Sequence, residues 1–198
     1  MGLKLEYHDG QTPLDEDEKE GLIVKSITTQ GELDELEQLN IEKAVIWTIS
    51  KKFRKEEILS ESFVRQLHKK MYGDVWNWAG QFRTTGKNIG VDWFVIGIEL
   101  KCLLDDTLYW IENETYPPDE IAIRFKHRLV SIHCFPNGNG RHSRLMADII
   151  IETIFEQPVF SWHHSNMVKP DETRRKYISA VKLADVGKIE PLLEFARG

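Results

Sequence analysis

Cysteine, long apolar runs and excess positive charge are all scarce in this sequence. Its 198 residues include only 2 cysteines, Cys102 and Cys134, without CxxC spacing, so neither a disulfide framework nor a thiolate zinc site is indicated. The most apolar segment, residues 146–155, is interrupted by Asp148 and Glu152 and is shorter than the ~20 apolar residues of a bilayer-crossing helix. The 26 basic and 32 acidic residues give a net charge of −6, which disfavours broad electrostatic attraction to nucleic acid. We therefore expect no membrane partner and no direct nucleic-acid binding.

The amino terminus also lacks the apolar stretch and cleavage site of a secretory signal, so we expect a cytoplasmic protein. No internal repeat, low-complexity tract or linker divides the chain, and its 41% hydrophobic and 29% charged residues are typical of a folded protein. We expect an N-terminal arm, residues 1–30, with a short candidate regulatory helix in its acidic cluster. Residues 31–198 are expected to form one domain.

Apolar residues recur at helical spacing along most of the chain, which predicts a mostly α fold. Ser60 is a typical helix cap and Gly73 a typical stop. Residues 76–97 differ, because Phe and Val residues flank a Thr-Thr-Gly-Lys-Asn-Ile-Gly turn sequence, which predicts a β-hairpin. The predicted helices cover residues 32–50, 60–73, 98–113, 119–132, 139–156, 171–183 and 189–196.

The residues that carry chemistry gather in HCFPNGNGRHSR, residues 133–144, between two predicted helices. Gly138 and Gly140 have no side chains, so backbone N–H groups can approach a ligand closely. The helix that begins near Asn139 presents its positive N-terminal end to the same place. This combination predicts an anion-binding cradle.

Three charged or titratable side chains surround this cradle. Arg141 and Arg144 are one helical turn apart, so both guanidinium groups can hold phosphate oxygens. His133, at the other end of the loop, can take a proton from a hydroxyl near neutral pH. Each residue alone fits a plain turn, a core histidine or a solvated helix face, but a plain turn has no need of all three. The spacing matches neither a P-loop nor a dinucleotide-binding fingerprint.

The segment resembles the signature HxFx[D/E]GNGRxxR of the Fic/Doc (Fido) family. The resemblance extends from about Trp76 to the C-terminal stretch, and implies a Fic-type helical bundle with one β-hairpin flap. The opening TPLDEDEKEGL, the stretch ITTQGELDELEQLNI and HCFPNGNGRHSRLMAD look like the bacterial branch called mobile mystery protein B. The signature is matched by His133, Phe135, Gly138, Asn139, Gly140, Arg141 and Arg144.

The resemblance implies a protein adenylyltransferase that moves AMP from ATP to a hydroxyl side chain of a target protein, with Mg²⁺. His133 would be the general base, Arg141 would hold the β-phosphate and Arg144 the γ-phosphate. The backbone of Gly138, Asn139 and Gly140 would line the anion hole around the α- and β-phosphates. The flap would hold an extended target segment by strand addition, at Thr84, Thr85, Gly86, Lys87 and Asn88.

Two features bear on activity and control. Asn137 stands where the family usually has Asp or Glu to hold Mg²⁺, and it can offer only a neutral amide oxygen. The cation would therefore be held mainly by ATP phosphates and water, and more weakly. Many relatives silence themselves with a glutamate that pairs with the second motif arginine. This chain has no clean copy of that sequence, and Glu20 in the N-terminal arm is the candidate autoinhibitory residue.

Three functions therefore remain open. They are AMP transfer, another nucleotide or phosphate-linked transfer or AMP removal on the same scaffold, and a catalytically weakened nucleotide-binding module. The mobile mystery branch further implies a toxin–antitoxin setting with a small DNA-binding companion protein.

Overall fold

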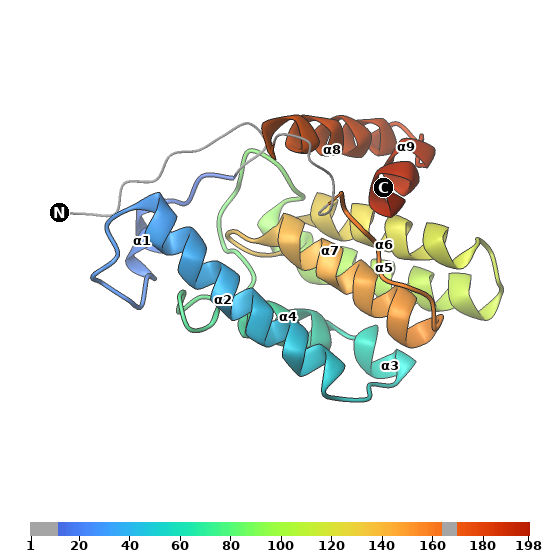
Figure 1. The fold of residues 1–198 in the computed structure, drawn as a ribbon, viewed down its shortest axis with the longest axis horizontal. Helices are drawn as coiled ribbons and strands as arrows, with labels where there is room; N and C mark the ends of the chain where they lie inside the picture. The colour runs from blue at the N-terminus through green and yellow to red at the C-terminus, as the bar shows by residue number, and fades with distance from the viewer. Residues whose placement is uncertain (1–11, 164–169) are drawn as a thin grey trace.

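The computed structural model describes residues 12–163 and 170–198, and most of these residues lie in helices (Figure 1). The elements in chain order are α1 (Glu16–Glu20), α2 (Gln30–Ile49), α3 (Lys55–Ile58), α4 (Glu61–Tyr72), the 3₁₀ turn η1 (Trp93–Val95), α5 (Ile96–Glu112), α6 (Pro118–Ile132), α7 (Asn139–Ile149), the π-helical turn η2 (Ile150–Ile154), α8 (Pro170–Asp185) and α9 (Glu190–Arg197). The predicted mostly α fold is confirmed, and the ends of the predicted helices agree to within two residues when α7 and η2 are taken together as the predicted helix 139–156. The four-residue helix α3 was not predicted.

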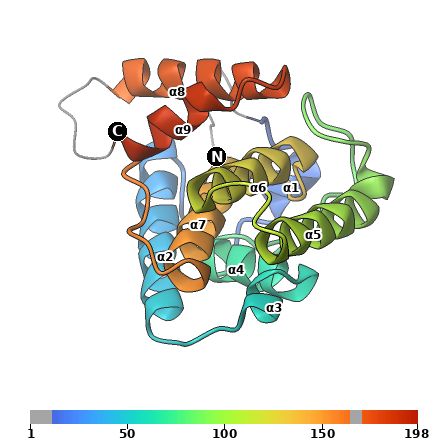
Figure 2. The same ribbon diagram turned by 90° about the vertical axis from the view of Figure 1, so that its right-hand side faces the viewer.

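Helix α7 lies at the centre of the bundle. It packs against α6 and α4, while α2 packs on α4 and α5 packs on α6. Helices α8 and α9 cross above this layer, as Figures 1 and 2 show from two directions. Met146 and Ala147 on α7 are completely buried. Because α7 is held on several sides, the loop that leads into it has a fixed position.

Local sequence explains how the helices next to this loop begin and end. The Ser60 hydroxyl accepts a hydrogen bond from the Phe63 N–H at 3.2 Å, as expected for the cap of α4. Pro118 opens α6, where its missing N–H costs nothing and its fixed φ suits the first turn. Helix α6 ends at His133, whose backbone is left-handed, with φ 58° and ψ 61°. This turn of the backbone directs the motif loop back towards α7.

The β-hairpin predicted for residues 76–97 is not formed: the structure describes this whole segment and places no strand in it. The backbone N–H of Arg83 donates to the Cys134 carbonyl at 2.9 Å, and that of Val91 donates to the Ile132 carbonyl at 3.3 Å. The two sides of the expected hairpin therefore pair with the start of the motif loop and the end of α6 instead of with each other. The Arg83 side chain lies between them and also donates to the Val91 carbonyl.

Within residues 12–163 and 170–198, no helix combines the length and apolar character needed to cross a membrane.

Candidate active site

The motif loop, residues 133–138, is closed by the side chain of Asn139. Its Oδ1 accepts from the Phe135 N–H at 3.0 Å, and its Nδ2 donates to the Phe135 carbonyl at 2.7 Å. Asn139 and Phe135 are both buried. The Asn139 side chain thus shapes the loop, and only its backbone is available to a ligand.

His68 on α4 also holds the motif loop in place, and the sequence did not predict this role. Its ring stacks on Phe135 with 3.7 Å between centroids. The Gly80 N–H donates to its Nδ1 at 3.0 Å, so Nε2 carries the proton and donates to the Asn137 carbonyl, also at 3.0 Å. Burial, with the nearby His142, holds the pKa of His68 well below its usual value. A permanently neutral His68 therefore ties α4 to the motif loop.

The N-terminus of α7 has the form of an anion cradle. Gly138 adopts φ 79°, and a Cβ there would lie 2.6 Å from the Tyr72 ring, so only glycine fits. As the N-cap, Gly138 offers no side chain to the first N–H groups of the helix. A Cβ built on Gly140 would meet nothing within 4 Å, so this side of the cradle is open. The geometry leaves room for a group that binds backbone N–H donors.

Arg141 lies in an ion pair that the sequence did not reveal. Its Nη2 is 2.6 Å from Oε2 of Glu37 on α2, and Oε1 of the same carboxylate accepts from Trp76 Nε1 at 2.7 Å. The guanidinium also lies over the Tyr72 ring, 5.1 Å from its centroid. Burial disfavours the charge, but Tyr72 and Glu37 outweigh it and raise the pKa of Arg141. The buried carboxylate of Glu37 thus pairs with the guanidinium group of Arg141, which a bound phosphate would need.

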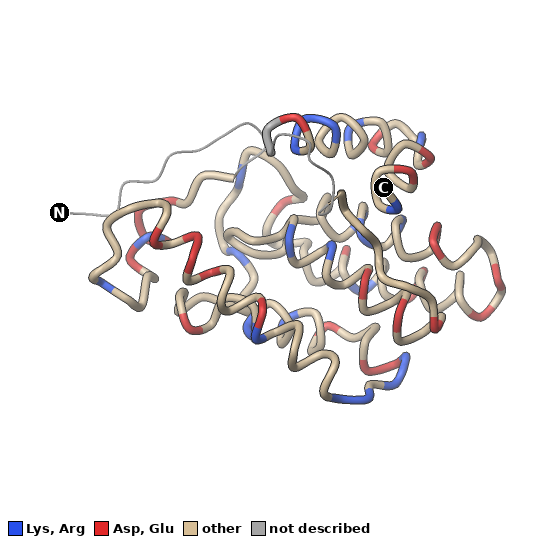
Figure 3. The backbone as a smooth tube through the Cα atoms, viewed as in Figure 1, with Lys and Arg blue, Asp and Glu red and all other residues tan. Residues whose placement is uncertain are grey.

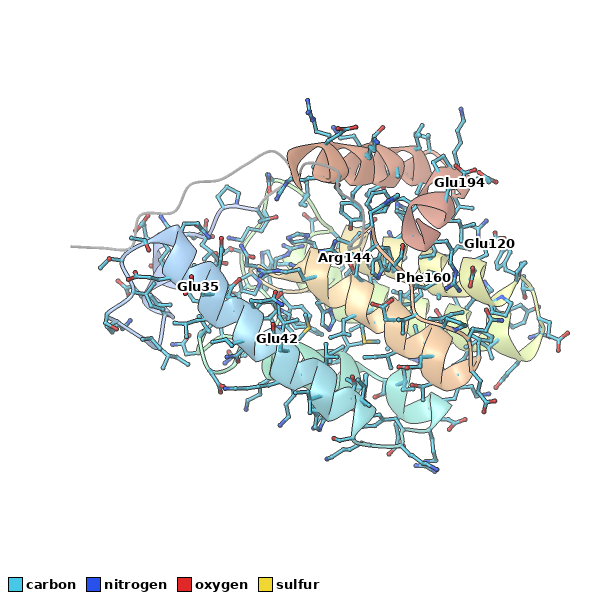
Figure 4. The ribbon with its side chains drawn as sticks, viewed as in Figure 1. Glu35, Glu42, Glu120, Arg144, Phe160 and Glu194 are labelled. Atoms are coloured by element: carbon cyan, nitrogen blue, oxygen red, sulfur yellow. The ribbon has the colours of Figure 1, made fainter. Side chains whose placement is uncertain are left out.

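Arg144, one turn further along α7, faces α8 instead of α2 (Figure 4). Its guanidinium lies 5.4 Å from the centroid of the Tyr177 ring. The ammonium group of Lys126 on α6 lies 4.4 Å from the same ring, and this lysine is fully buried. Burial lowers the pKa of Lys126. Figure 3 shows basic positions at the start of α7 and acidic positions along α1 and α2.

His133 lies beneath the N-terminal arm and is only 4% exposed. Its Nε2 is 3.0 Å from the hydroxyl oxygen of Thr12, a residue 121 positions earlier in the chain. Burial, with the charge of Arg83, lowers the pKa of His133 to about 4. The imidazole is therefore neutral at pH 7 and can accept a proton from a hydroxyl.

Arg83 fixes the backbone of His133 and was also missed in the sequence. Its Nε donates to the His133 carbonyl at 2.6 Å and its Nη1 to the Thr85 carbonyl at 2.8 Å. The side chain is buried, and burial lowers its pKa. Gly90 passes so close that a Cβ there would lie 2.7 Å from the Cβ of His133. The flap loop, residues 81–92, thus packs directly on the candidate base.

Asn137 does not have the arrangement of a metal ligand. Its Oδ1 accepts from the Gly138 N–H at 2.6 Å, and its Nδ2 donates to the Thr12 carbonyl at 3.1 Å. In the described part of the chain, no group of three or more His, Cys, Asp or Glu side chains could hold a metal ion. These residues do not fit a cation held by the protein itself.

The remaining predicted site residues are those of the flap and Glu20. Of the flap residues, Lys87 is drawn in and pairs with Asp15 and Glu18 of the arm. Glu20 is exposed at the end of α1. In residues 12–163 and 170–198, the carboxylate that forms an ion pair with a motif arginine belongs to Glu37. Four of the predicted target-binding residues are exposed, namely Thr84, Thr85, Gly86 and Asn88.

Known proteins share both the sequence and the fold of this region. The chain is 30% identical over 120 residues to protein adenylyltransferase fic-1 of Caenorhabditis elegans, covering 59% of this chain and 22% of that protein. It is 29% identical over 136 residues to protein adenylyltransferase Fic of Drosophila grimshawi, covering 67% of this chain and 26% of that protein. The chain thus spans about a quarter of the length of these curated relatives or less.

Solved structures extend the likeness to most of the chain. Fic-1 of C. elegans, as the E274G variant, superposes with a TM-score of 0.64 and 25% identity, covering 80% of this chain and 46% of that one. BepC of Bartonella tribocorum, with bound AMPPNP, superposes with a TM-score of 0.69 and 15% identity, covering 92% and 97%. The model of the Fic/DOC family matches residues 58–151 of this chain, a segment that contains the motif loop and both motif arginines.

Proposed function

We propose that this chain is a protein adenylyltransferase that moves AMP from ATP to a hydroxyl side chain of a target protein. The observation that carries the proposal is the 3.0 Å distance between His133 Nε2 and a hydroxyl oxygen, at the entrance of an anion cradle. The names of the curated relatives, and the AMPPNP bound to BepC, support the same reaction and the same donor.

Each motif residue has a role in this proposal. His133, neutral at pH 7, takes the proton of the attacking hydroxyl, because a base within hydrogen-bond distance of the proton is correctly placed to do so. Arg141 holds the β-phosphate and Arg144 the γ-phosphate, each as a planar donor that matches phosphate geometry. The N–H groups at the start of α7 bind phosphate oxygens at Gly138, Asn139 and Gly140. The target segment lies along the flap at Thr84, Thr85, Gly86, Lys87 and Asn88.

Mg²⁺ enters this proposal only as a counter-ion that ATP brings with it. A second candidate, a nucleotide-binding module that transfers nothing, is favoured by one observation: both polar atoms of the Asn137 amide are already engaged. Transfer of another phosphate-linked group and AMP removal remain predictions from the sequence resemblance.

Some wider assignments are part of the proposal. We assign residues 1–30 as a regulatory arm and residues 31–198 as the catalytic domain. Membership of the bacterial mobile mystery protein B branch stays a prediction from the sequence, as do a toxin–antitoxin setting, a DNA-binding companion and a cytoplasmic location.

Incubation with ATP labelled at the α- or the γ-phosphate tests the function. AMP transfer labels protein from the α-position only, phosphate transfer labels from the γ-position, and a binding module labels from neither. His133→Ala should reduce AMP transfer by about 10²- to 10⁴-fold while ATP binding persists, because the base acts on the hydroxyl and not on the phosphates. Arg144→Ala should instead weaken ATP binding. Unchanged transfer in the His133 variant would remove this residue from the role of base.

A further inference from the structure

The arm segment, residues 12–18, runs into the candidate active site. The Thr12 hydroxyl lies 3.0 Å from His133 Nε2, and the Thr12 carbonyl accepts from Asn137 Nδ2 at 3.1 Å. Thr12 is 6% exposed, so it is buried against the motif loop instead of lying on the surface. The chain therefore places one of its own hydroxyl groups on its candidate general base.

Charged groups hold the arm segment on the flap loop. Lys87 Nζ is 2.9 Å from Oδ2 of Asp15 and also pairs with Glu18, and the Lys87 side chain is only 3% exposed. The Thr85 hydroxyl donates to the same Asp15 oxygen at 3.0 Å. Lys87 also donates to the Pro13 carbonyl at 3.3 Å. Residues that would bind a target segment on the flap are thus engaged by the arm.

These polar contacts go beyond what a structural anchor needs. Leu14 is 5% exposed, and Trp78 Nε1 donates to the Glu18 carbonyl at 2.9 Å, so apolar and backbone contacts already attach the segment to the domain. They do not require a hydroxyl at position 12. The Thr12 hydroxyl adds a contact to His133, whose neutral imidazole can take up its proton.

We propose that the arm segment is an intramolecular substrate, and that Thr12 is the residue on which this chain accepts AMP. The inference rests on the proposed function and adds the acceptor. The Thr12 oxygen attacks the α-phosphorus of ATP, and its proton passes to His133 Nε2. The bond from the α-phosphorus to the oxygen bridging to the β-phosphate breaks, and pyrophosphate leaves. The products are a phosphodiester on Thr12 and pyrophosphate, so atoms and charges balance.

The test incubates the full chain with α-labelled ATP and locates the label by fragmentation of the tryptic peptide. This peptide is residues 5–19, and its hydroxyl side chains are Tyr7 and Thr12, which fragmentation distinguishes. We expect the label on Thr12, its loss in Thr12→Ala and its return in Thr12→Ser, because serine keeps the hydroxyl. Thr115→Ala, at an exposed threonine beyond the end of α5, is the matched control and should keep the full label.

Dilution and mixing show whether the transfer is intramolecular. The labelled fraction per unit time should not change when the protein is diluted tenfold. A His133→Ala chain mixed with the unaltered protein should stay unlabelled at Thr12, since each chain supplies its own base. Asp15→Asn should reduce the labelling of Thr12, because it weakens the ion pair that holds the arm segment on Lys87.

Failure of this inference differs from failure of the proposed function. Label that persists in Thr12→Ala, or that appears on the mixed His133→Ala chain, overturns the intramolecular acceptor while adenylyl transfer stands. Label on added target proteins but not on Thr12 has the same meaning. Absence of label on any protein overturns both.

Discussion

Replacement of Asn137 by aspartate tests the docking of the arm most directly. The Oδ1 of Asn137 accepts from the Gly138 N–H, and an aspartate oxygen can do the same. The Nδ2 donates to the Thr12 carbonyl at 3.1 Å, and there aspartate presents a second acceptor to an acceptor. Loss of the donor leaves the Thr12 carbonyl unpaired, which costs about 1–3 kcal/mol. Since 1.4 kcal/mol corresponds to tenfold, the docked arm should become about 5- to 140-fold less favoured.

Hydrogen exchange of the amides in residues 12–25 measures this release. Exchange should accelerate in Asn137→Asp and change less in Asn137→Ala, which loses the donor but brings in no charge. Asn113→Asp, at an exposed position at the end of α5, is the matched control and should leave the arm unchanged. The added carboxylate should also tighten ATP binding only when Mg²⁺ is present, because without the cation it repels phosphate. Unchanged arm protection in Asn137→Asp would refute the argument.

Two further predictions concern the carboxyl groups of Glu37, which is buried, and Asp148, which is partly buried. Glu37→Gln removes the charge that competes with phosphate for Arg141 and should tighten ATP binding, measured by titration calorimetry. Glu20→Gly, at an exposed position apart from that ion pair, should leave the ATP affinity unchanged. Tighter binding in the Glu20 variant alone would favour Glu20 as the inhibitory residue. Burial raises the pKa of Asp148 from 3.8 to about 7, so the folded chain binds an extra proton between these values and its free energy of unfolding should fall as pH rises from about 4 to 7. Asp148→Asn should flatten this slope in urea unfolding at several pH values, and an equally steep slope would assign the effect to another group.

The helices and the motif loop could be predicted because their signals are local. Helical spacing of apolar residues, with Ser60 at a cap and Gly73 at a stop, locates α4 to within a residue. Two glycines and two arginines within residues 138–144 are likewise visible in any short window of sequence. These features depend on neighbours three or four positions away, and sequence patterns report such neighbours well.

Arg83, His68 and Glu37 could not be predicted, because their partners lie far away in the chain. Arg83 binds a carbonyl 50 positions later, His68 one that is 69 positions later, and nothing beside either residue marks it. The hairpin prediction was wrong for a related reason. A turn sequence reports what a loop can do alone. Here the end of α6 and the start of the motif loop offer the hydrogen-bond partners that the two strands would have offered each other.

The departure of Asn137 from the acidic family pattern and the docked arm have a common explanation. An amide can donate a hydrogen bond to the Thr12 carbonyl, and a carboxylate cannot. Asparagine at position 137 therefore lacks the charge of a metal ligand but supplies a hydrogen bond that holds the arm segment. On the other side of the cradle, Glu37 presents a carboxylate to Arg141. Under the proposed function, the hydroxyl stands at the position of the target and the carboxylate at the position of a phosphate. ATP must then compete with Glu37, and an external target must compete with Thr12, so the same two contacts set the affinity for both substrates.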